Sequence, residues 1–204
     1  GRVIARPFIG ENAENFTRTK YRKDYSVVPK SDSIFDLAQA NNIKTIAIGK
    51  IDDLFGGKGL DETLHSKGNR ECMQTTIEVV KRQESSLIMT NLVDFDMVFG
   101  HQRDVIGFAE ELVRFDVELG ILLNLLTNDD LLILTADHGN DPTFTGTDHT
   151  REYVPILCYY NKMKLGVSLG TLETMADIAK TTAEFFNIKE STLKGKSFLK
   201  NCGL

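Results

Sequence analysis

Three loops of the sequence place histidines beside carboxylates. Asp137 and His138 are adjacent after an apolar run, and His149 follows eleven positions later (149 minus 138). Asp96 also follows an apolar run, and His101 comes five positions after it (101 minus 96). Carboxylate oxygens together with imidazole nitrogens suit Mn²⁺, Zn²⁺ or Fe²⁺, whereas an all-oxygen set suits Mg²⁺ or Ca²⁺. These residue types and spacings therefore predict a metal site.

Five candidate ligands are many for a single catalytic ion, which usually takes three protein ligands and keeps one position open. We therefore expect two ions, held by Asp96, His101, Asp137, His138 and His149. Paired metal ions are typical of phosphoryl chemistry, where they activate the attacking oxygen and offset the charge of the phosphoryl group. Because imidazole must be neutral to bind a metal, activity should fall in acid.

Other polar residues near these loops carry weaker signals. A single Asp or His after a strand is more often a turn or capping residue than a ligand, so we interpret His65 as an ordinary loop residue. Lys50 is a candidate contact for a phosphate group. Four acids flank the metal loops and either support the ligands or act as plain loop acids, the interpretation we favour slightly; they are Asp94, Asp104, Asp141 and Asp148.

Size, charge and cysteine content limit the other function classes. With 204 residues, the chain is long enough for one domain with a substantial core. Its formal net charge of -5 argues against a broad nucleic-acid surface, which needs a basic field. The three cysteines are odd in number and form no CxxC pattern, so they predict neither a disulfide framework nor a zinc finger. Without a leader-like or membrane-length apolar run, the sequence predicts a soluble cytoplasmic protein.

The apolar pattern also predicts the elements that must position these residues. Apolar residues at three-to-four spacing indicate four helices, at about 34–41, 69–83, 104–127 and 173–187. Short apolar or β-branched runs indicate four strands, at about 44–50, 86–93, 130–136 and 154–160. Ser33 precedes the first helix and is a residue type that caps helix N-termini. Strands alternating with helices predict an α/β fold, a three-layer sheet with helices on both faces.

The predicted topology brings the chemically active residues together. In open α/β sheets, functional groups gather beyond the carboxyl ends of the strands. The residues at or just after such ends are expected to share one rim of the sheet; they are Lys50, Asp96, Asp137 and His138. The glycine-rich loop at 55–59 lacks the GxxxxGK[ST] form of a nucleotide-binding P-loop, and we expect no nucleotide site there.

The segments that carry this chemistry resemble the alkaline phosphatase superfamily and, within it, the phosphopentomutase family. The resemblance rests on residues 91–104, 135–142 and 146–155, and it extends to residues 1–8 and 47–50. It implies an alkaline phosphatase-like α/β core interrupted by a cap domain, with substrate bound between the two. The family also uses an N-terminal Asp as a metal ligand and a phosphorylated Thr as nucleophile. Neither segment is present, which implies that this chain is a C-terminal fragment, inactive alone.

The resemblance further implies how the predicted ligands are shared. Asp96, His101 and His149 would hold one Mn²⁺, and Asp137 and His138 would hold the other. Zn²⁺ or another divalent ion remains an alternative at both positions.

The resemblance also implies a domain boundary near residue 27. Residues 1–26 would be the end of the cap domain, and residues 27–204 the C-terminal part of the metal-binding core. Lys50 would contact the phosphorylated Thr. The arginines implied to face the sugar phosphate are plain surface charges unless the rest of the protein completes their site; they are Arg2, Arg6 and Arg18.

The implied reaction interconverts ribose 1-phosphate and ribose 5-phosphate, and the 2-deoxyribose pair, with a sugar bisphosphate as activator. The implied partners are the pentose phosphate and the N-terminal part of the same protein, with no nucleic acid and no membrane. Two alternatives stay open. One is a cofactor-independent phosphoglycerate mutase or a phosphatase of the same superfamily, whose acid-to-His spacing differs. The other is a non-catalytic metal-binding domain.

Overall fold

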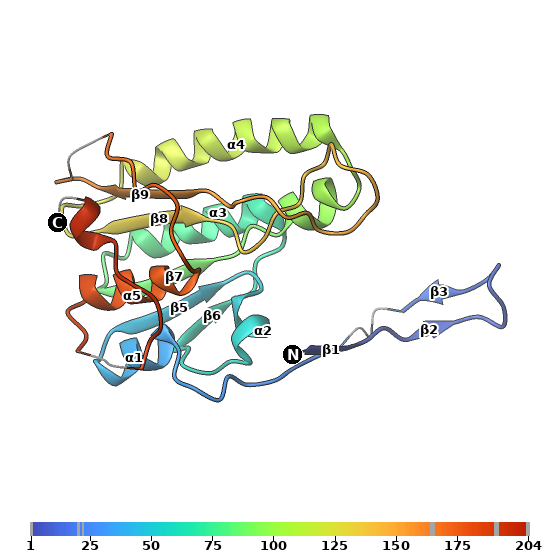
Figure 1. The fold of residues 1–204 in the computed structure, drawn as a ribbon. Coiled ribbons are helices and arrows are strands. Elements are labelled where there is room, and N and C mark those ends of the chain that lie inside the picture. The colour runs from blue at the N-terminus through green and yellow to red at the C-terminus, as the bar shows by residue number, and fades with distance from the viewer. Residues whose placement is uncertain (1, 20, 22, 164–165, 190–191, 203–204) are drawn as a thin grey trace.

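The body of the molecule is built on a short parallel sheet (Figure 1). The computed structural model describes residues 2–19, 21, 23–163, 166–189 and 192–202. In the order β6-β5-β7, the sheet consists of β6 (Glu62–Leu64), β5 (Lys44–Ile48) and β7 (Ser86–Thr90). β6 was missed by the sequence prediction because three residues are too few for a period-two pattern to be recognised.

The two faces of this sheet are covered by different helices. Ile46 and Ile48 of β5 pack against Cys72 of α3 (Gly68–Val80). Ala47, between them, packs instead against Phe35 of α1 (Ile34–Ala40). Because successive side chains of a strand point to opposite faces, this alternation places helices on both sides of the sheet. The predicted α/β fold with three layers is confirmed.

The remaining predicted strands form a separate pair. β8 (Leu131–Thr135) and β9 (Ile156–Tyr160) are antiparallel, with Leu131 opposite Tyr160 and Thr135 opposite Ile156. Among the described residues, they do not pair with β7, so the strands lie in two sheets. Leu132 of β8 packs against the cluster that joins α3 to Leu122 of α4 (Val105–Leu123). Apolar packing thus holds β8 to the body where strand pairing does not.

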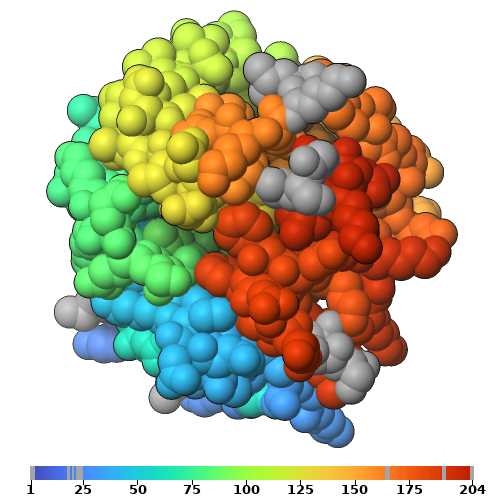
Figure 2. Space-filling view, turned by 90° about the vertical axis from the view of Figure 1, so that its left-hand side faces the viewer, coloured from blue at the N-terminus to red at the C-terminus, as the bar shows by residue number. Residues whose placement is uncertain are grey.

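Helix ends follow the expected local chemistry. Ser33 caps α1 through a capping box, in which its hydroxyl accepts from the Asp36 N–H while the Asp36 carboxylate accepts from the Ser33 N–H at 2.7 Å. α1 packs against α5 (Ala176–Phe185), and Figure 2 shows these two parts of the chain, blue and orange-red, side by side. A short helix, α2 (Ile51–Phe55), directly follows β5 and was not predicted.

The N-terminal residues form one long antiparallel hairpin, with two paired segments along its length, that extends from the body (Figure 1). β1 (Arg2–Ala5) pairs with β4 (Lys23–Ser26), and β2 (Phe8–Ile9) pairs with β3 (Thr17–Arg18). Apolar side chains on this extension are exposed, among them Val3 and Ile9. Among the described residues, none of the helices has the length and apolar character needed to cross a bilayer.

Candidate metal centre

Three predicted ligands from three loop positions converge. The ligand atoms of Asp96, His138 and His149 all lie within 4.8 Å of one another. His149 Nε2 is 3.1 Å from Asp96 Oδ1, and the rings of His138 and His149 stack with their centroids 3.8 Å apart. One carboxylate oxygen and two imidazole nitrogens are a donor set that suits Mn²⁺, Zn²⁺ or Fe²⁺. The residues present therefore fit a divalent ion.

The polypeptide reaches this point from two strands. Asp96 lies in the first turn of η1 (Phe95–Gly100), a π-helical turn that begins shortly after β7. His138 follows the end of β8, and His149 lies in the loop between β8 and β9. Wide helical turns of this kind are frequent at functional sites because they redirect side chains. Asp96 and His138 thus come together from beyond the ends of β7 and β8, although these strands lie in two sheets rather than in the single sheet that was predicted.

His101 lies beside the same carboxylate. Its Nε2 is 3.5 Å from Asp96 Oδ1, and its ring stacks on that of His149 with centroids 4.9 Å apart. Its Nδ1 is 2.5 Å from the Thr147 carbonyl oxygen. Because a carbonyl oxygen only accepts, Nδ1 must carry the hydrogen, which leaves Nε2 of the neutral ring free to bind a cation. A backbone carbonyl that orients a ligating histidine in this way is common in metal sites.

Asp137 is the outermost of the five predicted ligands. Its side chain is 68% exposed, and Oδ1 lies 3.7 Å from His138 Nε2. It is outside the three-residue cluster that surrounds Asp96. The structure thus groups three histidines around the Asp96 carboxylate and leaves Asp137 beside the group, next to His138.

Lys50 lies close to the metal loops. It follows the carboxyl end of β5, and its Nζ is 3.2 Å from Sδ of Met97, the residue after Asp96. His65 is exposed, and its Nδ1 lies 3.9 Å from the Asp52 carboxylate. Arg6 is exposed between the two paired segments of the N-terminal hairpin. The side chains of Arg2 and Arg18 lie outside what the structure describes.

Arg103 ties the loops of the centre together, and the sequence reasoning assigned it no role. Its guanidinium donates to Asn140 Oδ1 at 2.9 Å, to the Asp141 carbonyl oxygen at 2.8 Å and to the Asp148 carbonyl oxygen at 2.6 Å. It also donates to the carbonyl oxygen of Gly146. A guanidinium offers five N–H donors in a fixed planar fork, whereas the three donors of a lysine ammonium all project from one atom. The one side chain therefore holds the β8–β9 loop against η1.

Asn140 connects Arg103 to the predicted ligand Asp96. Its Nδ2 donates to Asp96 Oδ1 at 2.7 Å while its Oδ1 accepts from Arg103. Gly100 permits this approach, since a Cβ at that position would overlap the Asn140 amide. The sequence signal for Asn140 was its place two residues after His138, which could not show that it reaches Asp96.

The four flanking acids have structural partners rather than positions among the clustered ligands. The Asp94 carboxylate accepts from the Asn69 N–H at 2.7 Å, and Asp104 caps α4 by accepting from the Gly107 N–H at 2.9 Å. The Asp141 carboxylate accepts from the hydroxyl and backbone N–H of Thr143. Asp148 contributes its backbone carbonyl to Arg103.

Hydrogen bonds set the ionisation of Asp141. Its pKa lies below the ordinary value because Thr143 donates to the carboxylate from both side chain and backbone, with the Arg103 charge adding to the effect. The same loop is closed by Thr150, whose N–H donates to the Gly139 carbonyl oxygen at 3.1 Å and whose hydroxyl accepts from the Asp141 N–H at 2.6 Å. The loop that carries His138 and His149 is thus stabilised by polar contacts.

Comparisons with known proteins agree with a metal centre. A family model described as the Metalloenzyme superfamily matches residues 10–190. The phosphopentomutase of Clostridium novyi is 49% identical over 199 residues, which are 98% of this chain and 50% of the relative. That of Caldanaerobacter subterraneus is 48% identical over 204 residues, which are 100% of this chain and 51% of the relative. The chain spans about half the length of the curated relatives it matches.

A solved structure supports the fold. The crystal structure of Leishmania mexicana phosphoglycerate mutase at low cobalt concentration matches with a TM-score of 0.62 and 17% identity, over 80% of this chain and 38% of that one. At this identity, the likeness concerns the fold alone. The family match covers most of the chain, and the donor set suits a divalent ion. The chain therefore belongs to the Metalloenzyme superfamily.

Proposed function

We propose that this chain is the C-terminal part of a phosphopentomutase, which interconverts ribose 1-phosphate and ribose 5-phosphate and the 2-deoxyribose pair. The observation that carries the proposal is the convergence of Asp96, His138 and His149 in a chain that is 44–49% identical to proteins of that name. Together they connect a divalent-metal centre with phosphosugar chemistry.

We assign the ligands to two ions, with Mn²⁺ as the proposed metal. Asp96, His101 and His149 hold one ion, in support of which both histidine Nε2 atoms lie within 3.5 Å of the Asp96 carboxylate. Asp137 and His138 hold the other, in support of which Asp137 lies beside His138 and the His138 ring stacks on that of His149. When bound, such ions offset the negative charge of a phosphoryl group and polarise its oxygens. The histidines must be neutral to bind, so metal affinity falls in acid.

Lys50 is the proposed phosphate contact. Its contact with Met97 puts its ammonium beside the loop that carries Asp96. A compact cation at the edge of a metal centre can neutralise a phosphoryl oxygen that the metal ions do not reach. Arg2, Arg6 and Arg18 are proposed to face the sugar phosphate in the complete protein, which the exposed position of Arg6 permits.

The proposed complete protein supplies a second part that covers this one. Along α4, four apolar residues are at least half exposed and recur on one helical face: Ile106, Val113, Val117 and Ile121. β7 is at the edge of its sheet as described, so its outer backbone groups are open to another strand. We propose residues 27–204 as the C-terminal part of the metal-binding core and residues 1–26 as the end of a cap domain.

The remaining features of the proposal follow from the activity. A sugar bisphosphate serves as activator, and the protein works in the cytoplasm in nucleoside and pentose phosphate metabolism. The net charge of -5 fits a protein that has no nucleic-acid partner. The N-terminal part of the same polypeptide is the required partner and supplies the nucleophilic Thr.

The test is an assay of the full polypeptide, loaded with Mn²⁺, on ribose 1-phosphate and on phosphoglycerate. We expect turnover of the pentose phosphate, about two bound ions per chain, and no turnover by the 204-residue chain alone. Turnover of phosphoglycerate in place of the pentose would support the mutase alternative. Negligible metal uptake by the full polypeptide would support a non-catalytic domain and contradict the proposal.

A further inference from the structure

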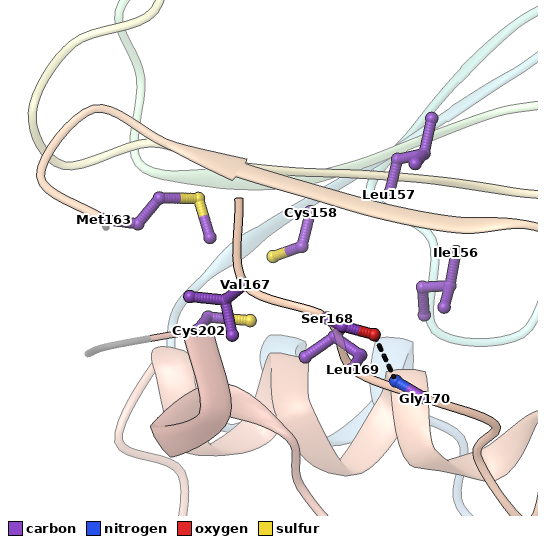
Figure 3. A pocket seen from close by; sticks show the side chains of 9 residues that line it. All are labelled: Ile156, Leu157, Cys158, Met163, Val167, Ser168, Leu169, Gly170 and Cys202. Atoms are coloured by element: carbon purple, nitrogen blue, oxygen red, sulfur yellow. Dashed lines mark hydrogen bonds between the residues drawn. The ribbon is translucent and has the colours of Figure 1, made fainter. Parts of the chain in front are cut away.

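Two cysteines that are far apart in the sequence line one cavity. The cavity measures about 330 Å³ and lies between β9 and the C-terminal turn η2 (Leu199–Cys202). Figure 3 shows the side chains of Cys158, from β9, and Cys202, from η2, pointing toward each other at one end of it. The rest of the described lining is uncharged and mostly apolar, with Met163 and Val167 nearest the thiols.

The two thiols face each other across one end of the cavity although they are 44 positions apart in the sequence (202 minus 158). The neighbouring Cys202 thiol contributes to the raised pKa of Cys158. Cys202 is held in place because η2 is anchored on α5: the Phe198 N–H donates to Thr181 Oγ1 at 3.0 Å, and Phe198 is buried. Cys158 is fixed by the pairing of β9 with β8, opposite Ile133. The rigid elements on both sides therefore keep the sulfurs together.

We propose that Cys158 and Cys202 are a reversible thiol–disulfide pair, which closes by exchange with a small disulfide that enters the cavity. The half-buried Cys158 reacts first: its thiolate attacks one sulfur of the small disulfide, the S–S bond breaks, and a thiolate leaves and takes up a proton. Cys202 then attacks the sulfur of Cys158 in the mixed disulfide and releases the second small thiol. Two protein thiols are oxidised, and one disulfide is reduced to two thiols.

The cavity is what distinguishes this pair from the third cysteine. Cys72 in α3 is fully buried, contacts the Ser66 carbonyl oxygen and does not line the cavity. Burial raises the pKa of Cys72 to about 11, and burial together with the neighbouring Cys202 thiol raises that of Cys158 to about 12. If thiolate fraction alone set the rate, Cys72 would react first. Access through the cavity predicts the reverse order.

The raised pKa values of the thiols predict that the rate of disulfide formation depends strongly on pH. A thiol whose pKa lies far above neutrality is protonated at neutral pH, and only the thiolate attacks a disulfide. No acid or base other than the cysteines belongs to the described lining that could alter this. The closing rate should therefore rise about tenfold per pH unit between roughly pH 7 and pH 9.

The experiment treats the full natural polypeptide with hydroxyethyl disulfide, a small uncharged probe that suits an apolar cavity. Free thiols and cross-linked peptides are followed by mass spectrometry at a series of pH values. We expect a Cys158–Cys202 peptide to form, Cys72 to remain free, and the midpoint of thermal unfolding to rise, because the link closes a long loop. Failure to form that peptide, although both cysteines react after denaturation, would overturn the proposal.

Two variants make the result specific. In Cys202→Ser, the first step still occurs but the second cannot, so a stable mixed disulfide should remain on Cys158. In the matched control Cys72→Ser, the internal disulfide should form as in the parent. A Cys202→Ser protein that resists modification at Cys158 while remaining folded, or a reaction at Cys72 that precedes the one at Cys158, would contradict the order of events. Phosphosugar turnover is not needed for either readout.

Discussion

The metal loops and the parallel sheet are held together by different forces. Ile46 and Ile48 of β5 are fully buried and pack against apolar side chains. The ligands Asp96, His138 and His149 are half-buried or exposed, and hydrogen bonds from Asn140, and through it Arg103, position the first of them. Apolar burial is strong and non-directional, whereas hydrogen bonds fix orientation at a smaller net gain in stability. Changes in the two regions should therefore separate stability from metal binding.

The largest effect should come from a ligand. Asp96→Asn nearly preserves shape but removes the charge that lies between His101 and His149. Metal affinity should fall by more than about a hundredfold, beyond the usual effect of residues that only orient ligands, while the midpoint of denaturant unfolding without metal changes little. Calorimetric titration with Mn²⁺ measures the first quantity. The control is Asp148→Asn, since Asp148 contacts Arg103 through its backbone; an equal loss there would contradict the assignment.

A core substitution should show the opposite pattern. Ile48→Ala removes a fully buried side chain from the cluster with Cys72 and Val79. We expect the free energy of unfolding to fall by about 2–5 kcal/mol, with the metal affinity of the folded fraction unchanged. Urea unfolding and metal titration on the same preparation measure both. Leu157→Ala is the control, because Leu157 is 62% exposed in β9 and should cost far less.

Arg103 should affect the orientation of the ligands more than the stability of the fold. Arg103→Lys keeps the charge but loses the separate guanidinium nitrogens, Nη1 and Nη2, that donate to Asn140, Asp141 and Asp148. Metal affinity should fall about 10- to 100-fold, as is typical when a residue that positions a ligand is lost. Arg82→Lys is the matched control, since Arg82 pairs with Glu62 at an exposed site where ion pairs contribute little. Similar losses of metal affinity in both variants would contradict the specific role of Arg103 in positioning the ligands.

The smallest effect should be a change in the pKa of Asp141 and in how the stability of the fold depends on pH. Thr143→Ala removes the hydroxyl that donates to Asp141, so the lowered pKa of Asp141 should move up toward its usual value. Because that pKa is lowered in the folded state, its stabilising effect is present above the ordinary aspartate value and is lost as pH falls through the folded value. The variant should be slightly less stable at neutral pH and should match the parent in strong acid. NMR titration of the Asp141 carboxyl measures the shift directly.

Local patterns predicted the longer elements well. α1 begins after Ser33, and β5, α3, β7, α4, β8, β9 and α5 lie within or close to the ranges expected from apolar spacing. The short elements α2 and β6 were missed because five and three residues carry too little periodicity. The π-helical turn at Phe95–Gly100 was also missed, since no simple spacing distinguishes it from a loop.

The candidate site was predictable in its residue types and less so in its contacts. Asp96 and His138 lie close together, as expected of residues that follow strand ends, but β7 and β8 belong to two sheets rather than to the single sheet that was predicted. The bridge from Arg103 through Asn140 to Asp96 joins positions 44 and 37 residues apart in the sequence. The division of the ligands between two ions remains a prediction.

The sequence by itself determined which side-chain types are available to bind a metal, the net negative charge and the order of the longer helices and strands, because each depends on residue type and short-range periodicity. The tertiary structure alone decided that His149 stacks on His138, that Arg103 closes the loops, and that Cys158 and Cys202 line one cavity. Those contacts depend on the path of the loops and on how packed elements bring distant backbone positions together. No spacing along the chain encodes such a path.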